Sequence, residues 1–282
     1  MRYLILAIGL SFSFISCSKN NSKGIQEEKL AAATYLDLGY GTDAKQKLDI
    51  YLPESRTNKT RTLIIIHGGG WTAGDKSDFN SYITEFQKRL PGYAFVNLNY
   101  RLASANGNYF PTQENDIKSA MQFLVDNSGK YNISKDFVIL GVSAGAQLGL
   151  LQGYKHTDVV KPIGLISYFG PTDLQLLYEN STGSLPLILK TITNSTIESN
   201  PNILKEASPV NYAGSNSAPT LLLHGDADNL VPLEQATLLN GKLAELGVQH
   251  ELVVYPGQGH DGWTQEALFD SFTKVESFIK GL

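Results

Sequence analysis

Apolar runs and stretches with a helical period alternate along most of the chain. Residues 62–66 and 137–140 are continuous apolar runs, which are typical of strands buried on both faces of a parallel sheet. Residues 114–127 repeat apolar side chains every three or four positions and therefore predict an amphipathic helix. Apolar and polar residues alternate over 47–52, which predicts a strand that pairs with 34–38 in an antiparallel hairpin.

Strands that alternate with helices predict an α/β fold, in which right-handed βαβ units build a mostly parallel central sheet with helices on both faces. Residues 174–212 are locally apolar but lack a regular period, so we expect a small cap insertion there, within one domain over residues 34–282. The apolar residues 185–189 fit either a lid over a pocket or a core helix. The other predicted elements are strands at 93–99, 163–168, 219–224 and 250–255, and helices at 81–90, 144–154, 232–246 and 264–279.

The first 17 residues have the pattern of a signal peptide. A positive start is followed by an apolar stretch over residues 4–15, which is shorter than the ~20 apolar residues that span a bilayer. Cys17 is the only cysteine, so no intramolecular disulfide can form. It follows a small residue, an arrangement that resembles the lipobox of bacterial lipoproteins, in which the cysteine is lipidated; a plain cleaved signal is the alternative. Residues 18–33 are then expected to be a polar tether.

The composition is ordinary for a globular protein of 282 residues, with 42% hydrophobic and 18% charged residues. A net charge of −4 gives no reason to expect nucleic acid or an anionic membrane surface as a partner. Together with the signal-peptide pattern and the lipobox-like Cys17, this indicates a secreted protein of the bacterial cell envelope, which we expect to reach the membrane only through a lipid on Cys17.

Candidate chemistry centres on the sequence Gly141-Val142-Ser143-Ala144-Gly145. It stands between a predicted strand and a predicted helix, and this order of strand, G-x-S-x-G turn and helix forms the nucleophile elbow of an α/β-hydrolase. Glycine at both flanks leaves room for a tight, strained turn that presents the serine hydroxyl at the carboxyl end of the sheet. A glycine-rich turn that contains a serine by chance is the alternative, and the other strand ends decide between the two.

Three further strands end in residues that carry chemistry, and functional groups in such a sheet gather at the carboxyl ends. His67 and three glycines directly follow the strand predicted at 62–66. Asp226 and Asp228 follow the strand at 219–224, and His260 follows the strand at 250–255. With Ser143 they give the chain order Ser, Asp, His, which is that of α/β-hydrolases. The sequence has no His-Glu-x-x-His motif and no second cysteine, so we expect no metal site.

Six motifs stand in order along the chain: His67-Gly68-Gly69-Gly70-Trp71, Asn99-Tyr100-Arg101-Leu102, Gly141-Val142-Ser143-Ala144-Gly145, Gly170-Pro171-Thr172-Asp173-Leu174, His224-Gly225-Asp226-Ala227-Asp228 and Gly259-His260. With these motifs, the chain from residue 34 onward resembles the α/β-hydrolase superfamily, in its hormone-sensitive-lipase-like and bacterial carbohydrate (acetyl or feruloyl) esterase branches. The lipase-like branch usually follows Tyr-Arg-Leu-Ala with Pro-Glu, where this chain has Ser104-Ala105. That branch also has a long N-terminal cap, which this chain is expected to lack. Both differences favour the smaller carbohydrate esterases.

The resemblance implies that Ser143 is the nucleophile, His260 the general base and Asp228 the carboxylate that holds His260 in the right tautomer. Asp228 is preferred to Asp226 because the family's acid is the second aspartate of this motif. Asp226 is expected to cap the loop backbone instead.

Backbone N–H donors for an oxyanion are expected from Ala144, the residue after the nucleophile, and from Gly69 and Gly70 of the glycine loop. Trp71 is the neighbouring alternative to these two glycines. The side chains of Trp71 and Trp263 stand next to the motifs, so they are expected either to line the pocket or to pack in the core.

Other polar residues are expected to be structural. His67 and His224 are expected to hold their loops, and Asp116 and Asp173 to be cap or turn carboxylates. Arg101 fits either the binding of a carboxylated substrate or, more simply, a buried ion pair that holds its loop.

The sequence therefore predicts a serine carboxylesterase that hydrolyses short-chain esters of small molecules or polysaccharides, with acetyl and feruloyl groups as candidates, through an acyl-enzyme. It would need no metal or organic cofactor. Fold and triad do not fix the substrate, so an amide-cleaving enzyme on the same scaffold, a peptidase or a formamidase, is the first alternative. A catalytically silent, hydrolase-like binding protein is the second, but such proteins usually lose the nucleophile or the base.

Overall fold

The computed structural model describes residues 29–181, 183–194, 197, 200 and 202–282. The expected signal peptide, the lipidation site Cys17 and the tether up to residue 28 lie outside the described residues. Within the described part, no helix is both long enough and apolar enough to cross a membrane.

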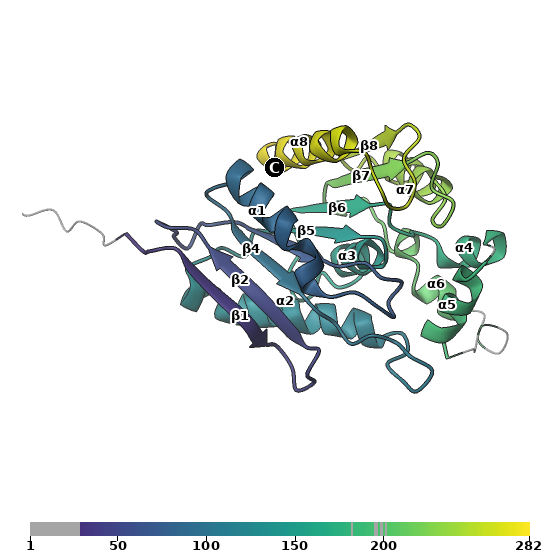
Figure 1. The fold of residues 1–282 in the computed structure, drawn as a ribbon, viewed down its shortest axis with the longest axis horizontal. Helices are drawn as coiled ribbons and strands as arrows, with labels where there is room; N and C mark the ends of the chain where they lie inside the picture. The colour runs from purple at the N-terminus through teal and green to yellow at the C-terminus, as the bar shows by residue number, and fades with distance from the viewer. Residues whose placement is uncertain (1–28, 182, 195–196, 198–199, 201) are drawn as a thin grey trace, which may run out of the picture.

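The described residues form a mixed sheet of eight strands (Figure 1). The strands are β1 (Ala33–Gly39), β2 (Lys47–Leu52), β3 (Thr62–Ile66), β4 (Ala94–Leu98), β5 (Phe137–Val142), β6 (Gly164–Tyr168), β7 (Thr220–Gly225) and β8 (His250–Tyr255). Their order in the sheet is β1-β2-β4-β3-β5-β6-β7-β8, and every pair from β4 to β8 is parallel. β1 and β2 form the predicted hairpin and pair antiparallel with β4 through β2. The predicted mostly parallel sheet is therefore confirmed.

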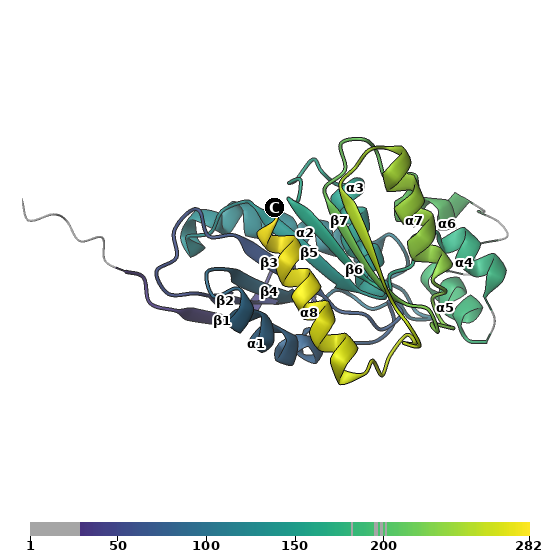
Figure 2. The same cartoon turned by 90° about the horizontal axis from the view of Figure 1, so that it is seen from above.

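Helices cover both faces of the sheet, as predicted. They are η1 (Lys76–Phe79), α1 (Asn80–Arg89), α2 (Thr112–Tyr131), α3 (Ala144–Tyr154), α7 (Glu234–Glu245) and α8 (Gln265–Lys280). Successive side chains of a strand point to opposite faces. Ile64 and Ile66 of β3 therefore pack in one core with α2, α3 and α7, whereas Leu63 and Ile65 pack in a second core with α1 and α8. Figure 2 shows these helices on the two sides of the sheet.

Helix α2 is longer than its predicted range of 114–127. The added residues at its C-terminal end are polar up to Tyr131, whose ring is buried, so the apolar period that marks the rest of the helix fades there. The helix ends at Asn132, which has the left-handed conformation that asparagine tolerates after a helix.

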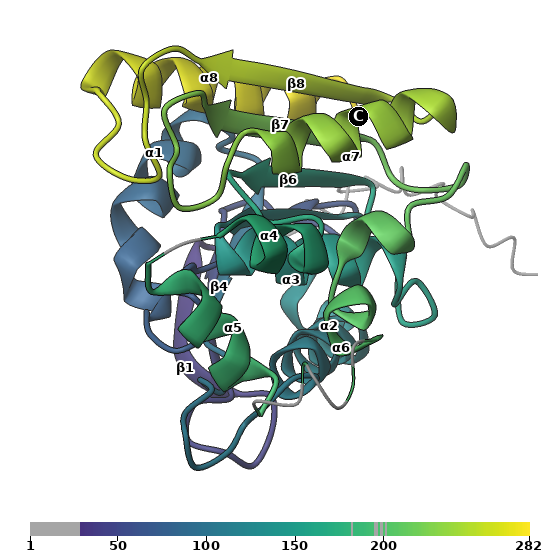
Figure 3. The ribbon, with the colours of Figure 1, turned by 90° about the vertical axis from the view of Figure 1, so that its right-hand side faces the viewer.

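The cap segment, residues 174–212, lies over the carboxyl ends of the central strands (Figure 3). The segment lacks a regular period in the sequence but contains short helices, of which only the one at 185–189 had been offered as an alternative, because helices this short do not show a clear period. Asp173 directly precedes the segment and is the N-cap of its first helix, one of the two roles expected for it, since its side chain accepts the N–H groups of Gln175 and Leu176. The helices are α4 (Leu174–Asn180), α5 (Leu185–Ile192), α6 (Asn202–Glu206) and η2 (Pro209–Asn211).

Arg101 forms the ion pair that the sequence offered as one of two alternatives. Its Nη2 lies 2.6 Å from Asp116 Oδ1, and its backbone N–H donates to Oδ2 of the same carboxylate at 2.8 Å. Asp116 is therefore not a cap, as we had expected, but a buried residue inside α2 that also accepts a hydrogen bond from Gln46 Nε2. The hydrogen bond to Asp116 raises the pKa of Arg101, so Arg101 stays charged, and its contacts with Asp116 tie the end of β4 to α2.

Two close backbone approaches fix the turn between β5 and α3. A Cβ on Gly141 would lie 2.3 Å from the carbonyl oxygen of Gly145. A Cβ on Gly145 would lie 2.3 Å from the carbonyl oxygen of Ile66 and 2.4 Å from that of His67. Backbone oxygens cannot rotate away as a side chain can, so the turn requires glycine at both positions.

We expect Gly145→Ala to destabilise the fold by about 3 kcal/mol, because the added methyl group overlaps two backbone carbonyls. The matched control is Gly241→Ala in α7, where no atom lies within 4 Å of the added Cβ. Alanine favours a helix over glycine, so this control should be more stable than the wild type by up to about 1 kcal/mol. Urea unfolding measures both changes, and equal stability of the two variants would contradict the close approach.

Candidate active site

Ser143 follows β5 in a strained backbone conformation. Its φ of 53° and ψ of −120° lie outside the regions that L-residues favour. Its N–H donates to the carbonyl oxygen of Tyr168 at 2.9 Å, and its own carbonyl accepts the N–H groups of Ala146 and Gln147. The backbone of Ser143 is therefore fixed between β6 and α3, and its side chain lines a cavity at the carboxyl ends of the strands.

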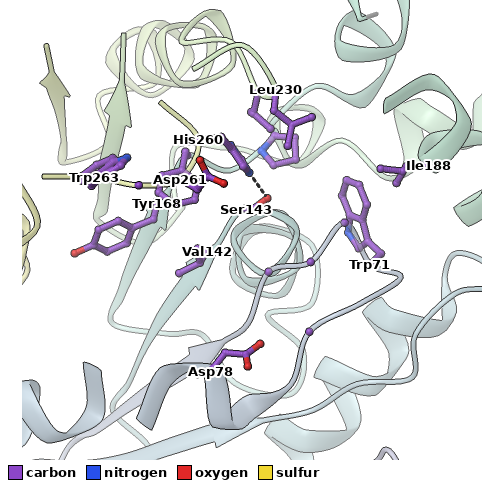
Figure 4. A pocket seen from close by; sticks show the side chains of 18 of the residues that line it. Trp71, Asp78, Val142, Ser143, Tyr168, Ile188, Leu230, His260, Asp261 and Trp263 are labelled. Atoms are coloured by element: carbon purple, nitrogen blue, oxygen red, sulfur yellow. Dashed lines mark hydrogen bonds between the residues drawn. The ribbon is translucent and has the colours of Figure 1, made fainter. Parts of the chain in front are cut away.

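The predicted Ser143, His260 and Asp228 form a hydrogen-bonded row. Ser143 Oγ lies 2.9 Å from His260 Nε2 (Figure 4), and His260 Nδ1 lies 2.8 Å from Asp228 Oδ2. When Nδ1–H donates to the carboxylate, Nε2 is free to accept the serine O–H. Asp226 stands apart from this row, because its Oδ1 accepts the backbone N–H of Gly257 at 2.6 Å, as a loop cap would.

Asp228 is buried, and its surroundings keep it ionised. Burial by itself raises the pKa of a carboxyl group, but hydrogen bonds from His224, His260 and the N–H of Val231 outweigh burial and hold the pKa of Asp228 well below its usual range. Oδ1 accepts the N–H groups of Leu230 and Val231 at 2.9 and 2.8 Å. His224 stands behind the carboxylate, with Nε2 3.5 Å from Asp228 Oδ2 and 2.8 Å from the carbonyl oxygen of Val231, a structural position as expected.

The glycine loop, residues 68–71, lines the cavity beside Ser143. A Cβ on its first residue would lie 3.2 Å from Ser143 Cβ, so the loop and Ser143 are in contact. Gly69 and Gly70 have φ of 102° and 57°, and a Cβ on Gly69 would lie 2.2 Å from the carbonyl oxygen of Ala73. Glycine is therefore required at Gly69 on steric grounds.

Ala144 is the first residue of α3, and the first N–H groups of a helix have no partner within it. The aligned peptide dipoles add a partial positive charge at this end of the helix. The three predicted donors, Gly69, Gly70 and Ala144, thus lie on the two chain segments that meet at Ser143.

A buried aromatic pair supports the glycine loop from behind. The ring of His67 stacks on Tyr100 at 4.3 Å between centroids, and the Tyr100 hydroxyl lies 3.1 Å from the carbonyl oxygen of His67, to which it donates. His67 Nδ1–H donates to the carbonyl oxygen of Gly68 at 2.7 Å. Burial lowers the pKa of His67, so it is a neutral loop support, as expected from the sequence.

Trp71 and Trp263 both line the cavity, and both are also packed in place. Trp71 Nε1 donates to Gln147 Oε1 at 2.9 Å, and Trp263 Nε1 donates to the carbonyl oxygen of Gly259 at 2.9 Å. The two alternatives offered by the sequence, lining and packing, therefore hold together for each tryptophan.

The cavity has a volume of about 690 Å³ around Ser143 and His260. Ile188 and Trp71 lie on one side of Ser143, and Tyr168 and Trp263 lie on the other (Figure 4). Helix α5 accordingly serves both of its expected roles, because Leu185 and Ile188 line the cavity while Leu185, Leu189 and Ile192 are buried.

Sequence reasoning missed half of the side chains that line the cavity. The missed side chains are Asp78, Phe79, Tyr82, Tyr168, Phe169, Leu177, Leu230, Asp261 and Leu268. Tyr168 and Phe169 had a signal, since they stand at the carboxyl end of a predicted strand. Arg101 does not line the cavity. In the part of the chain that the structure describes, no group of three or more His, Cys, Asp or Glu side chains could hold a metal ion.

The sequence profile of the BD-FAE family matches residues 48–243, which is more than half of the chain. The chain belongs to the BD-FAE family of α/β-hydrolases. The matched range contains Ser143 and Asp228, whereas His260 follows it. The predicted α/β-hydrolase fold is thereby confirmed.

Relatives of this BD-FAE member include Esterase LipC of Mycobacterium tuberculosis, which is 26% identical over 241 residues, or 78% of this chain and 58% of LipC. The structure resembles a bifunctional GH43-CE of Bacteroides eggerthii, with a TM-score of 0.74, 25% identity, and coverage of 86% of this chain and 38% of that one. It also resembles a truncated carbohydrate esterase from gut microbiota, with a TM-score of 0.73, 24% identity, and coverage of 88% and 98%. The chain spans about half the length of the curated relatives it matches first.

We expect the stability difference between the wild type and Asp228→Asn to shrink as the pH falls below about 4, the ordinary pKa of aspartate. The pKa of Asp228 is lower in the folded than in the unfolded state, so its ionised form stabilises the fold above that pH. The contribution is lost as the pH falls through the folded-state value. Urea unfolding of both proteins at neutral pH and at about pH 2.5 measures the change. A difference that widens toward acid would contradict the lowered pKa.

Proposed function

We propose that this protein is a serine carboxylesterase that hydrolyses short-chain carboxylic esters through an acyl-enzyme. The observation that carries the proposal is the row from Asp228 through His260 to Ser143, with the serine hydroxyl at the wall of a cavity. Membership of the BD-FAE family and similarity to Esterase LipC support the same reaction class.

The geometry gives each group a step. His260 Nε2 accepts the Ser143 proton while Oγ attacks the carbonyl carbon of the ester, and the resulting imidazolium then gives that proton to the leaving alcohol. Water, deprotonated by the same nitrogen, attacks the carbonyl carbon of the acyl-enzyme, and the imidazolium gives its proton to Ser143 Oγ as the bond between Oγ and the acyl group breaks and the acid leaves. Asp228 remains ionised throughout, holds the His260 tautomer and stabilises the imidazolium.

Negative charge develops on the carbonyl oxygen when Ser143 attacks. Backbone N–H groups of Ala144 and of Gly69 or Gly70 are fixed in place before the reaction, so they stabilise this charge without reorganisation. Loss of one such donor typically raises the barrier by about 3 kcal/mol. No metal or organic cofactor takes part in any of these steps.

Acetyl or feruloyl groups on polysaccharides are the proposed natural substrates. The family's name stands for bifunctional acetyl/feruloyl esterase, and the similar structures include a truncated carbohydrate esterase from gut microbiota and the bifunctional GH43-CE of Bacteroides eggerthii. A cavity of about 690 Å³ falls in the size range of small-molecule sites, and its aromatic side suits an aromatic acyl group as well as a sugar ring. We further propose that Cys17 carries a lipid that anchors the protein in the bacterial cell envelope.

We expect the protein to hydrolyse p-nitrophenyl acetate faster than the butyrate and the octanoate. Ser143→Ala should lower this activity by at least about 10⁴-fold, because no other group in the row can form the acyl-enzyme. The matched control is Ser277→Ala, an exposed position in α8, which should keep wild-type activity. Release of acetate from acetylated xylan is the next measurement.

Labelling of Ser143 by an organophosphonate, measured beside the ester assays, gives two outcomes that would overturn the esterase proposal. Labelling of Ser143 by an organophosphonate without hydrolysis of any ester would point to amides and formamides as substrates. A protein that neither hydrolyses esters nor reacts with the phosphonate would instead be a silent, hydrolase-like binding protein.

A further inference from the structure

Phe169, directly after β6, has a backbone conformation that phenylalanine rarely adopts. Its φ of 39° lies in the left-handed region, which glycine enters freely and bulky residues avoid. Its N–H donates to the carbonyl oxygen of Leu223 at 2.8 Å, so the conformation is tied to β7. Gly170 then packs against α3, where a Cβ would lie 2.5 Å from Ala146 Cβ. The chain turns sharply at this point, and a glycine at position 169 would make the turn without strain.

The ring of Phe169 packs against the ring of His260. Their centroids are 4.8 Å apart and their planes are inclined by 63°. The same ring contacts Trp263 at 5.6 Å and lines the cavity. A single strained residue therefore places an aromatic wall against the histidine that bonds to Ser143.

Hydrogen bonds alone leave one motion of the His260 ring open. The bonds to Ser143 and Asp228 fix its two nitrogens, but the ring can still tilt about the line that joins them. Phe169 fills the space on one side of the ring and blocks that tilt. Hydrogen bonds weaken steeply as their angles depart from linear, so a tilted ring would accept the serine proton poorly.

We propose that Phe169 is a positioning residue for His260, and that its strained backbone is retained because only this conformation brings the ring against the histidine. Strain of this kind persists where the surrounding structure enforces it and is concentrated at functional sites. The inference rests on the proposed role of His260 as the general base.

The first test compares Phe169→Leu, Phe169→Ala and Phe169→Tyr in hydrolysis of p-nitrophenyl acetate. Leucine and alanine should lower kcat about ten- to a hundredfold and leave KM nearly unchanged, because misplacement of the base slows the chemical step more than it weakens binding of a small ester. Tyrosine keeps the ring and should restore kcat. Phe269→Leu, which changes an exposed aromatic residue on α8, should behave as the wild type.

The rate at which a fluorophosphonate labels Ser143 gives a second readout that needs no ester turnover. It should fall in parallel with kcat in the leucine and alanine variants. Unchanged labelling with a change in KM alone would show that Phe169 is a cavity wall only, and would overturn the proposal. A wild type that is labelled but hydrolyses no ester would overturn the proposed function, while the labelling rates would still decide the role of Phe169.

The role of strain is tested by Phe169→Ala against Phe169→Gly. Both remove the ring, so both should be equally slow, but glycine relieves the left-handed backbone and should unfold at a higher urea concentration than alanine. If alanine were the more stable of the two, the strain argument would be wrong.

A crystal structure of Phe169→Ala tests the geometry without any activity. The His260 ring should be tilted or split between two orientations, with Nε2 no longer at hydrogen-bond distance from Ser143 Oγ in full occupancy. A ring that stays in its place beside the serine would overturn the proposal.

Discussion

The site depends on the close approach of two backbone turns, the elbow after β5 and the glycine loop after β3. Because Gly145 has no Cβ, the elbow reaches the carbonyl oxygens of Ile66 and His67, and Ser143 is held against the glycine loop. Steric contact thus brings Ser143, the proposed nucleophile, and the proposed N–H donors together before any polar interaction is considered. Donors that stabilise an oxyanion act best when they are fixed in advance, and the contact between the two turns supplies that fixation.

Two buried carboxylates then hold the site in place, and their partners separate their roles. Asp116 binds Arg101, which is always charged, and so fixes the end of β4 next to Tyr100, the support of the glycine loop. Asp228 binds His260, whose ring can gain and release a proton, so in the proposed reaction the carboxylate stabilises the imidazolium that forms when Ser143 is deprotonated. Each carboxylate has several hydrogen-bond donors, as a buried charge requires. Arg101 cannot lose its proton, so Asp116 is a structural carboxylate. His260 can release a proton, so Asp228 is the carboxylate that we propose for the reaction.

The sequence predicts the sheet and the hydrogen-bonded row because both follow from local patterns. Apolar runs mark the buried strands, and the carboxyl ends of parallel strands must meet, so Ser143, Asp228 and His260 converge. Apart from α5, which the sequence offered as one alternative, the helices of the cap segment escaped prediction because they are short and their burial depends on the fold beneath them. Asp116 was misjudged because its partner, Arg101, lies 15 residues away across a turn, where no helical spacing connects them. Phe169 stands at the carboxyl end of a predicted strand, but its role was missed because neither its positive φ nor its contact with His260 leaves a pattern in the sequence.

Backbone strain in the described residues is distributed in a way that agrees with these roles. Most of their non-glycine residues with positive φ are Asn, Asp or Ser, but two are aromatic, Trp71 at 60° and Phe169 at 39°. Both line the cavity, as does Ser143 at 53°, and each stands directly after a glycine loop or a strand end. Bulky residues with positive φ raise the energy of the folded state, so the fold tolerates them only where the direction of the side chain matters more than stability. Trp71 directs its indole to Gln147 and to the cavity, and Phe169 directs its ring to His260. The same reasoning that explains the strained serine of the elbow therefore extends to its two aromatic neighbours in the cavity wall.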